Sequence, residues 1–247
     1  MESSLHEQIS SGNSTVMLLL LLLVLIIIDS LGLPHLVEGS SPRTEIVKNH
    51  EPSHIQVCCG WGNKLMNGTL TYRTIGGDIT TQQGVREAIH EWNTKMGGNI
   101  RIIEVSADNV SPDIEINFNS NSQKLSDSSN TMITSGYMGK NAVTAGQSVN
   151  SFDEDGFITN VKITISRSAF GHTFDLNKIK QLTEHEVGHA LGLQHTNFNG
   201  DLMSSIVSDK ADSISKCDIN AVLEANYWKT IELGINPHSP YVKYVVC

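Results

Sequence analysis

Three histidines and a glutamate stand close together in one short segment of the 247-residue chain. His185 and His189 are four residues apart, so on an α-helix their imidazoles lie on the same face, one turn apart, as two ligands of one metal ion require. Glu186 follows the first histidine and can place its carboxylate beside a bound metal without ligating it. This pattern predicts a catalytic zinc ion whose activated water gives its proton to Glu186 as general base.

Gly192 and His195 complete this segment, HEVGHALGLQH. A glycine can take the left-handed conformation at the end of a helix and reverse the chain, so that His195 returns as the third ligand. Three neutral histidines leave the fourth metal position open for water. The alternative is a chance HExxH motif that binds no metal, but chance seldom also supplies the glycine and the third histidine at the required positions.

The segment resembles the signature of the metzincin zinc endopeptidases, HExxHxxGxxH followed by a methionine in a tight turn beneath the metal. Met203, eight residues past His195, fits this Met-turn; the alternative is a methionine that only fills the core. The spacing and Thr196 resemble the matrixin branch, the relatives of the matrix metalloproteinases. The resemblance implies one catalytic Zn²⁺ on His185, His189 and His195, Glu186 as the catalytic residue, and structural roles for Gly192 and Met203.

The segments around the motif are expected to form the elements that position it. Apolar periodicity predicts a strand over 70–73, a helix over 81–96, and strands over 100–105, 113–118 and 158–165. The apolar face of the expected helix contains Val85, Ala88, Ile89 and Trp92.

The segment ISKCDINAVLEANYW resembles the C-terminal helix of the family, with Ile219, Val222 and Leu223 as its buried stripe. The resemblance covers residues 61–228. It implies an α+β fold, with a twisted mixed, mostly parallel β-sheet, an active-site helix, a second packing helix and a C-terminal helix after the Met-turn.

Residues 120–150 are rich in Ser, Asn, Thr and Gly and lack the histidines of the loop that holds a structural zinc and calcium in vertebrate matrixins. We therefore predict no second zinc. Asp153, Glu154 and Asp155 offer oxygen ligands for calcium, but Lys162 occupies the place of the closing glutamate of an EF-hand. A polar turn before the strand at 158–165 is the preferred interpretation, and a calcium site is the alternative.

An uninterrupted apolar run covers residues 16–28. It is short for a bilayer span and suits the hydrophobic region of a signal peptide. No lysine or arginine precedes it, so charge does not indicate its orientation, and an uncleaved anchor is the alternative. We expect a signal peptide or anchor over 1–40, a linker over 41–57, and a catalytic domain with a C-terminal tail over 58–247.

Four cysteines lie outside the motif, at Cys58, Cys59, Cys217 and Cys247. In an exported protein they are expected to form two disulfides. Because a bridge between adjacent residues is strained, we expect Cys58 and Cys59 each to pair with Cys217 or Cys247. The alternative takes Cys58 or Cys59 as the inhibitory thiolate of many matrixin propeptides, although the family's PRCGxPD string is missing.

Composition agrees with one globular domain, and 26 acidic against 17 basic residues give a formal charge of −9, which disfavours nucleic acid as a partner. The prediction is a secreted or cell-surface, monomeric zinc metalloendopeptidase that acts on proteins or peptides and meets the membrane only through a possible N-terminal anchor. The alternatives are a non-catalytic zinc protein with the same fold and a hydrolase of non-peptide substrates. Glu186 argues against the first, because a structural zinc site does not need an unligated carboxylate.

Overall fold

The computed structural model describes residues 51–106, 110–119, 132–138, 143–169, 171–206, 213–230 and 236–247. The apolar run at 16–28 and the expected segment at 1–40 lie outside the described residues. Glu51–Cys247 forms one unit of tertiary structure. Within the described part of the chain, no helix is long and apolar enough to span a bilayer.

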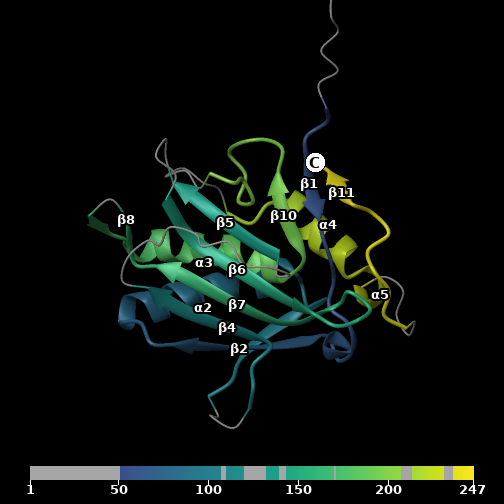
Figure 1. The fold of residues 1–247 in the computed structure, drawn as a ribbon, viewed down its shortest axis with the longest axis horizontal. Helices are drawn as coiled ribbons and strands as arrows, with labels where there is room; N and C mark the ends of the chain where they lie inside the picture. The colour runs from purple at the N-terminus through teal and green to yellow at the C-terminus, as the bar shows by residue number, and fades with distance from the viewer. Residues whose placement is uncertain are drawn as a thin grey trace, which may run out of the picture. The chain divides into compact units, whose positions relative to one another are not determined.

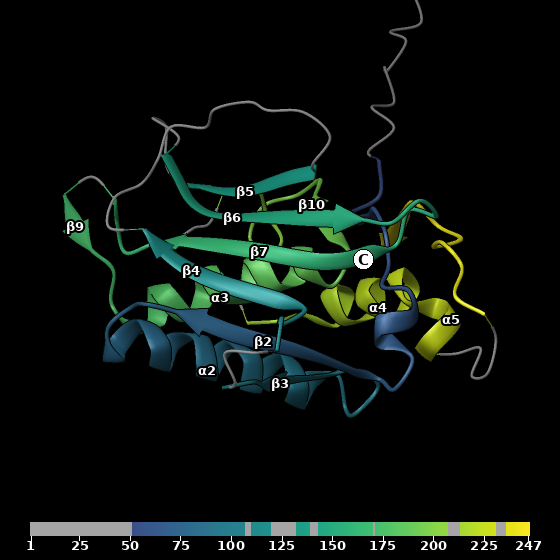
Figure 2. The same cartoon turned by 60° about the horizontal axis from the view of Figure 1, so that its bottom comes forward.

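A six-stranded sheet with the order β3-β2-β4-β7-β6-β5 is the main layer of this unit. Its strands are β2 (Thr69–Ile75), β3 (Arg101–Glu104), β4 (Ile114–Asn119), β5 (Met132–Met138), β6 (Val143–Phe152) and β7 (Ile158–Ser166). The pairings among β3, β2, β4 and β7 are parallel, whereas β6 and β5 are antiparallel to their neighbours. Figures 1 and 2 both show the two long helices on one face of this sheet.

Helix α2 (Ile79–Lys95) begins at an N-cap that the sequence provides, because the Asp78 side chain accepts a hydrogen bond from the Thr81 amide at 2.9 Å. Its expected apolar face is confirmed: Val85, Ala88, Ile89 and Trp92 are all buried. This face packs toward the sheet and toward the second long helix. Helix α2 therefore packs directly against the helix that carries the histidine motif.

Helix α3 (Leu176–Ala190) carries the first two histidines of the motif. Asp175 caps it by accepting from the Lys178 amide at 2.8 Å. Gly84 of α2 allows the two helices to approach closely, since a Cβ at this position would lie 2.7 Å from Ile179 Cγ2.

Two buried tryptophans hold the last turns of α3. Trp92 Nε1 donates to the Glu184 carbonyl oxygen at 3.0 Å, and Trp61 Nε1 donates to the Ala190 carbonyl oxygen at 2.8 Å. Because these carbonyls flank the ligand-bearing turns on both sides, the tryptophans fix the segment along the helix axis.

A second, three-stranded sheet has the order β10-β1-β11, with antiparallel pairings. In Figure 1 the C-terminal strand lies beside β1. Its strands are β1 (His54–Val57), β10 (Leu193–Thr196) and β11 (Tyr244–Val246). The remaining elements are η1 (Asn63–Leu65), β8 (Ser168–Ala169), β9 (His172–Thr173), α4 (Lys216–Ala225) and α5 (Tyr227–Thr230).

The expected architecture is confirmed, with a mixed, mostly parallel sheet and three main helices. The strands expected at 70–73, 100–105, 113–118 and 158–165 are β2, β3, β4 and β7, and the helix expected at 81–96 is α2. Seven strands of the described residues were not predicted: β1, β5, β6, β8, β9, β10 and β11.

The buried stripe expected on the C-terminal helix α4 is only partly right. Val222 is buried, but Ile219 and Leu223 are only half-buried. The face that packs inward contains Asp218, Ala221, Val222 and Ala225. Ala225 lies close to the chain reversal after α3, since a Cβ on Gly192 would be 3.0 Å from Ala225 Cβ, so this position has room only for a small side chain.

The expected disulfide pairing is wrong: Cys58 is bonded to Cys59, and Cys217 to Cys247, with a Cα–Cα distance of 5.3 Å in the second bridge. The reason is the register of β11 on β1. The Cys247 amide donates to the Ser53 carbonyl oxygen at 2.8 Å, so Cys247 lies at the start of β1. Cys58 lies five residues further, roughly 16 Å along an extended strand, beyond the reach of a bridge.

Both adjacent cysteines are therefore oxidised in the structure, and neither Cys58 nor Cys59 is a free thiol. This contradicts the alternative in which one of them is an inhibitory zinc ligand.

Candidate metal centre

The three histidines of the motif meet at one point. His185 and His189 are fully buried on α3, and their Nε2 atoms lie 3.1 Å apart. One ligand atom from each of His185, His189 and His195 lies within 4.8 Å of the other two. Among the described residues, no other group of three or more His, Cys, Asp or Glu side chains converges in this way.

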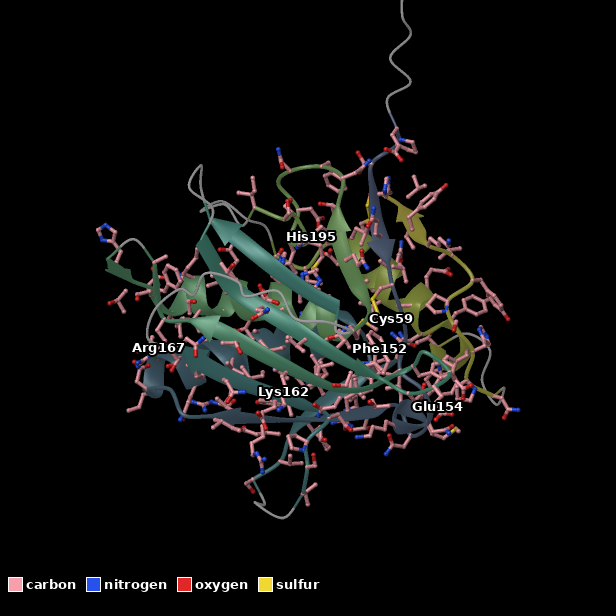
Figure 3. The ribbon with its side chains drawn as sticks, in the orientation of Figure 1. Cys59, Phe152, Glu154, Lys162, Arg167 and His195 are labelled. Carbon is pink, nitrogen blue, oxygen red and sulfur yellow. A yellow bond between two sulfur atoms is a disulfide. The ribbon has the colours of Figure 1, made fainter. Side chains whose placement is uncertain are left out.

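Gly192 makes the chain reversal that the sequence predicted. It follows the last turn of α3 with φ of +104°, in the left-handed region that favours glycine. A Cβ at this position would collide with the carbonyl oxygen of Cys59, and the Cys58 amide donates to the Gly192 carbonyl oxygen at 3.0 Å. The reversed chain becomes β10, which brings His195 back to the helix (Figure 3).

Backbone carbonyls set the tautomers of the two helical histidines. His185 Nδ1 donates to the Leu202 oxygen at 2.6 Å, and His189 Nδ1 donates to the Leu193 oxygen at 2.9 Å. Since a carbonyl only accepts, the proton of each neutral imidazole is on Nδ1, and the Nε2 lone pairs face each other.

This arrangement fits a zinc ion. Two opposed lone pairs 3.1 Å apart repel each other unless a cation lies between them, and the buried His195 Nε2 has no hydrogen-bond partner among the described residues. Tetrahedral coordination with Zn–N bonds of 2.0–2.1 Å places ligand nitrogens about 3.3 Å apart. Hydrogen bonds from Nδ1 to carbonyls are also the usual outer support of zinc-binding histidines.

Burial keeps the three imidazoles neutral. It lowers the pKa of His185 to about 4, and it lowers the pKa of His189 well below the usual value, where the neighbouring histidines add to the effect. Burial also lowers the pKa of His195. At neutral pH each ring therefore has the lone pair that metal binding requires.

Met203 lies beneath α3, where the sequence placed it. It is fully buried, and a Cβ on Gly188 would lie 2.5 Å from its Sδ atom, so the thioether packs directly against the helix backbone between the two ligands. Its carbonyl accepts from the Thr196 amide at 2.9 Å, and Asp201 Oδ1 accepts from the Met203 amide at 2.9 Å. The turn thus connects the floor of the site to the strand of the third histidine.

Glu186 is fully buried on α3, on the turn between the two helical histidines. Its carboxylate faces β6 at Gly146: the three heavy atoms closest to a Cβ built at Gly146 all belong to the Glu186 side chain. Nearby on the same strand, Asn150 Nδ2 donates to the His189 carbonyl oxygen at 3.2 Å. Neither β6 residue is among the predicted site residues, because the small and polar positions Gly146, Ser148 and Asn150 lack the apolar alternation that predicts a strand.

The acidic segment before β7 forms a polar turn, as preferred from the sequence. Asp153 Oδ1 accepts from the amides of Asp155 and Phe157, at 3.1 and 2.9 Å, and Gly156 has φ of +83°. This carboxylate oxygen therefore closes the turn onto its own backbone.

A family model described as matrixin matches residues 61–227. A search of curated proteins gives no match. The matched region begins at Trp61, which supports the end of α3, and it includes the three histidines, Glu186 and Met203. Since the match covers more than half of the chain and the histidine group can hold a metal, the chain belongs to the matrixin family, whose domain indicates a function of the metalloprotease type.

Proposed function

We propose that this chain is a zinc-dependent endopeptidase that hydrolyses peptide bonds in proteins or peptides, with Glu186 as general base. The observation that carries the proposal is the convergence of three histidine nitrogens beside a buried glutamate that is not one of the ligands. Zinc on these nitrogens supplies a Lewis acid that polarises a peptide carbonyl and lowers the pKa of water.

The residues of the chain have separate tasks in this proposal. The Leu202 and Leu193 carbonyls hold His185 and His189 in the ligating tautomer. Glu186 accepts a proton from the attacking water and passes it to the leaving amine. Its burial places the proton transfer in a low-dielectric environment, where charge interactions are stronger than in water. Met203 supplies an apolar floor that keeps the ligand-bearing turn in place.

We further propose that the enzyme acts outside the cytoplasm, as a monomer. The apolar run at 16–28 supports a signal peptide or anchor within 1–40, and residues 41–57 would link it to a catalytic domain over 58–247. Two disulfides support export, since such bonds persist in oxidising compartments.

The test is Glu186→Ala in the purified full chain. This variant should keep one zinc per chain by metal analysis and lose at least a hundredfold in the rate of hydrolysis of a denatured protein, on the scale of general acid–base catalysis (about 10²–10⁴-fold). Glu154→Ala, in the exposed turn before β7, is the control and should retain the full rate. Undiminished hydrolysis by Glu186→Ala contradicts the mechanism, and a zinc-loaded native chain without peptidase activity contradicts the proposed function.

A further inference from the structure

The position of the Glu186 carboxylate depends on the strand opposite the helix. Glu186 is fully buried, and on the sheet side it meets β6, which lies against α3. A Cβ added to Gly146 would collide with Glu186 Oε1 and would lie 2.9 Å from both Cδ and Cγ. The carboxylate therefore occupies the volume that a side chain at residue 146 would fill.

The backbone at Gly146 does not itself require glycine. Its φ is not among the positive values found at nine other glycines of the described residues, so an alanine can adopt the same conformation. Gly146 pairs antiparallel with Ile165 on β7 and with Gly136 on β5, and the β5 register shifts only after this pair, between Gly136 and Tyr137. Space for Glu186, and not backbone geometry, is what the absent side chain provides.

The neighbouring positions of β6 support this interpretation. Gly146, Ser148 and Asn150 alternate along the strand, and all three are buried. Asn150 reaches the His189 carbonyl oxygen with its amide group. Side-chain size thus decreases along β6 from Asn150, which contacts His189, to Gly146, which lies against Glu186.

We infer that Gly146 is a positioning residue for Glu186. The bare backbone of β6 at this point fixes where the carboxylate lies relative to the three histidine nitrogens. The catalytic consequence of this inference rests on the proposed function, whereas the steric relation between residues 146 and 186 does not.

The first experiment compares Gly146→Ala with the native chain. Glu186 is the far end of a flexible side chain, so it should swing aside while the fold and the zinc ligands remain. One zinc per chain should be retained, and kcat/KM should fall about 10–100-fold, as expected for a displacement near 1 Å of a catalytic group. Gln147→Ala, the next residue on the same strand and only half-buried, is the matched control and should stay within twofold of the native rate. Full activity of Gly146→Ala would overturn the inference.

A double-mutant cycle with Glu186→Asp separates positioning from general damage to the strand. Aspartate is one methylene shorter, so it withdraws the carboxylate from residue 146. Glu186→Asp alone should lower the rate, but Gly146→Ala should then cost less than threefold in addition. Equal fold-losses in both backgrounds would mean that the two sites act independently and would overturn the inference.

Thermal unfolding of the zinc-free protein gives a readout that does not depend on activity. Gly146→Ala should lower Tm by about 3 °C, and Glu186→Asp in the same chain should restore at least half of that loss. If the native chain shows no peptidase activity but this coupling is present, the proposed function fails and the positioning role stands. If the coupling is absent, the inference is wrong whatever the activity.

Discussion

The two sides of α3 support the same turns of helix in different ways. On the side of β10 and the Met-turn, the support consists of directional hydrogen bonds. Two backbone carbonyls accept from the imidazoles of His185 and His189, and Asp201 accepts from the Met203 amide. On the side of β6, the strand contributes mainly shape, with a bare backbone at Gly146. The comparison indicates that His185 and His189 need specifically placed hydrogen-bond partners, whereas Glu186 needs a correctly sized space.

The strongest test of this difference removes the third ligand. His195→Ala should weaken zinc binding by more than the roughly 10–100-fold that loss of an outer hydrogen-bond partner costs, because it removes one of the three nitrogens that would hold the metal. Glu224→Ala, on α4, should leave the metal content intact, since Glu224 is not part of the converging group. Competition with a chelator measures both affinities. Zinc retained without His195 but lost without Glu224 would break the comparison.

A second test asks whether the Met-turn side depends on a buried carboxyl group. Burial, with the neighbouring charge of Asp201, raises the pKa of Asp218 to about 7 from 3.8. A raised pKa in the folded state favours the neutral form, so its contribution to stability is present below the unfolded pKa and is lost as pH rises through 7.

The free energy of unfolding of the native chain should therefore decline between pH 5 and pH 8, and Asp218→Asn should make this decline smaller. The free energy of unfolding of the native chain, compared with that of the variant, should fall by on the order of 2 kcal/mol across this range. Urea unfolding at each pH measures the difference, and Asp155→Asn, in the exposed turn, controls for the change of one carboxylate. A difference that stays constant with pH would show that Asp218 does not titrate in this window.

The smallest expected effect is on the β6 side. Asn150→Ala removes the hydrogen bond to the His189 carbonyl oxygen and should lower the free energy of unfolding by about 1 kcal/mol. Zinc affinity should change by less than threefold. Asn160→Ala is the matched control, because Asn160 donates to the carbonyl oxygens of Pro112 and Asp113, which precede β4 and lie away from the site. A loss of zinc as large as that in His195→Ala would erase the distinction between the two sides.

The same distinction explains what the sequence could predict. The residues of the motif were identified because each has a chemical requirement that few residue types meet, and Gly192 because its φ of +104° favours glycine. β6 was missed because its inward face is small and polar, at Gly146, Ser148 and Asn150, so it lacks the apolar alternation by which strands are recognised. These β6 residues are buried by α3, which lies about forty residues further along the sequence.

Two further errors have the same origin. Strain between adjacent cysteines disfavours a Cys58–Cys59 bridge, but the register of β11 on β1 decides the pairing by placing Cys247 beside Ser53. Apolarity predicts the stripe on α4 at Ile219, Val222 and Leu223, but the close approach of Gly192 favours the small Ala225 on the inward face. Both outcomes depend on contacts between distant segments, which local patterns do not contain.

The edge of the main sheet has a consequence for access to Glu186. β5 pairs along β6 from Met132 opposite Asn150 to Met138 opposite Val143, with Gly136 opposite Gly146. β6 is therefore an interior strand at the point where it meets Glu186, because β5 already pairs with its outward edge on both sides of the register shift between Gly136 and Tyr137. An extended peptide that approached the glutamate along β6 could not simply add a strand to the sheet, as peptides do at open edges. It would have to exchange with β5, so the first polypeptide backbone to compete for that position belongs to this chain itself.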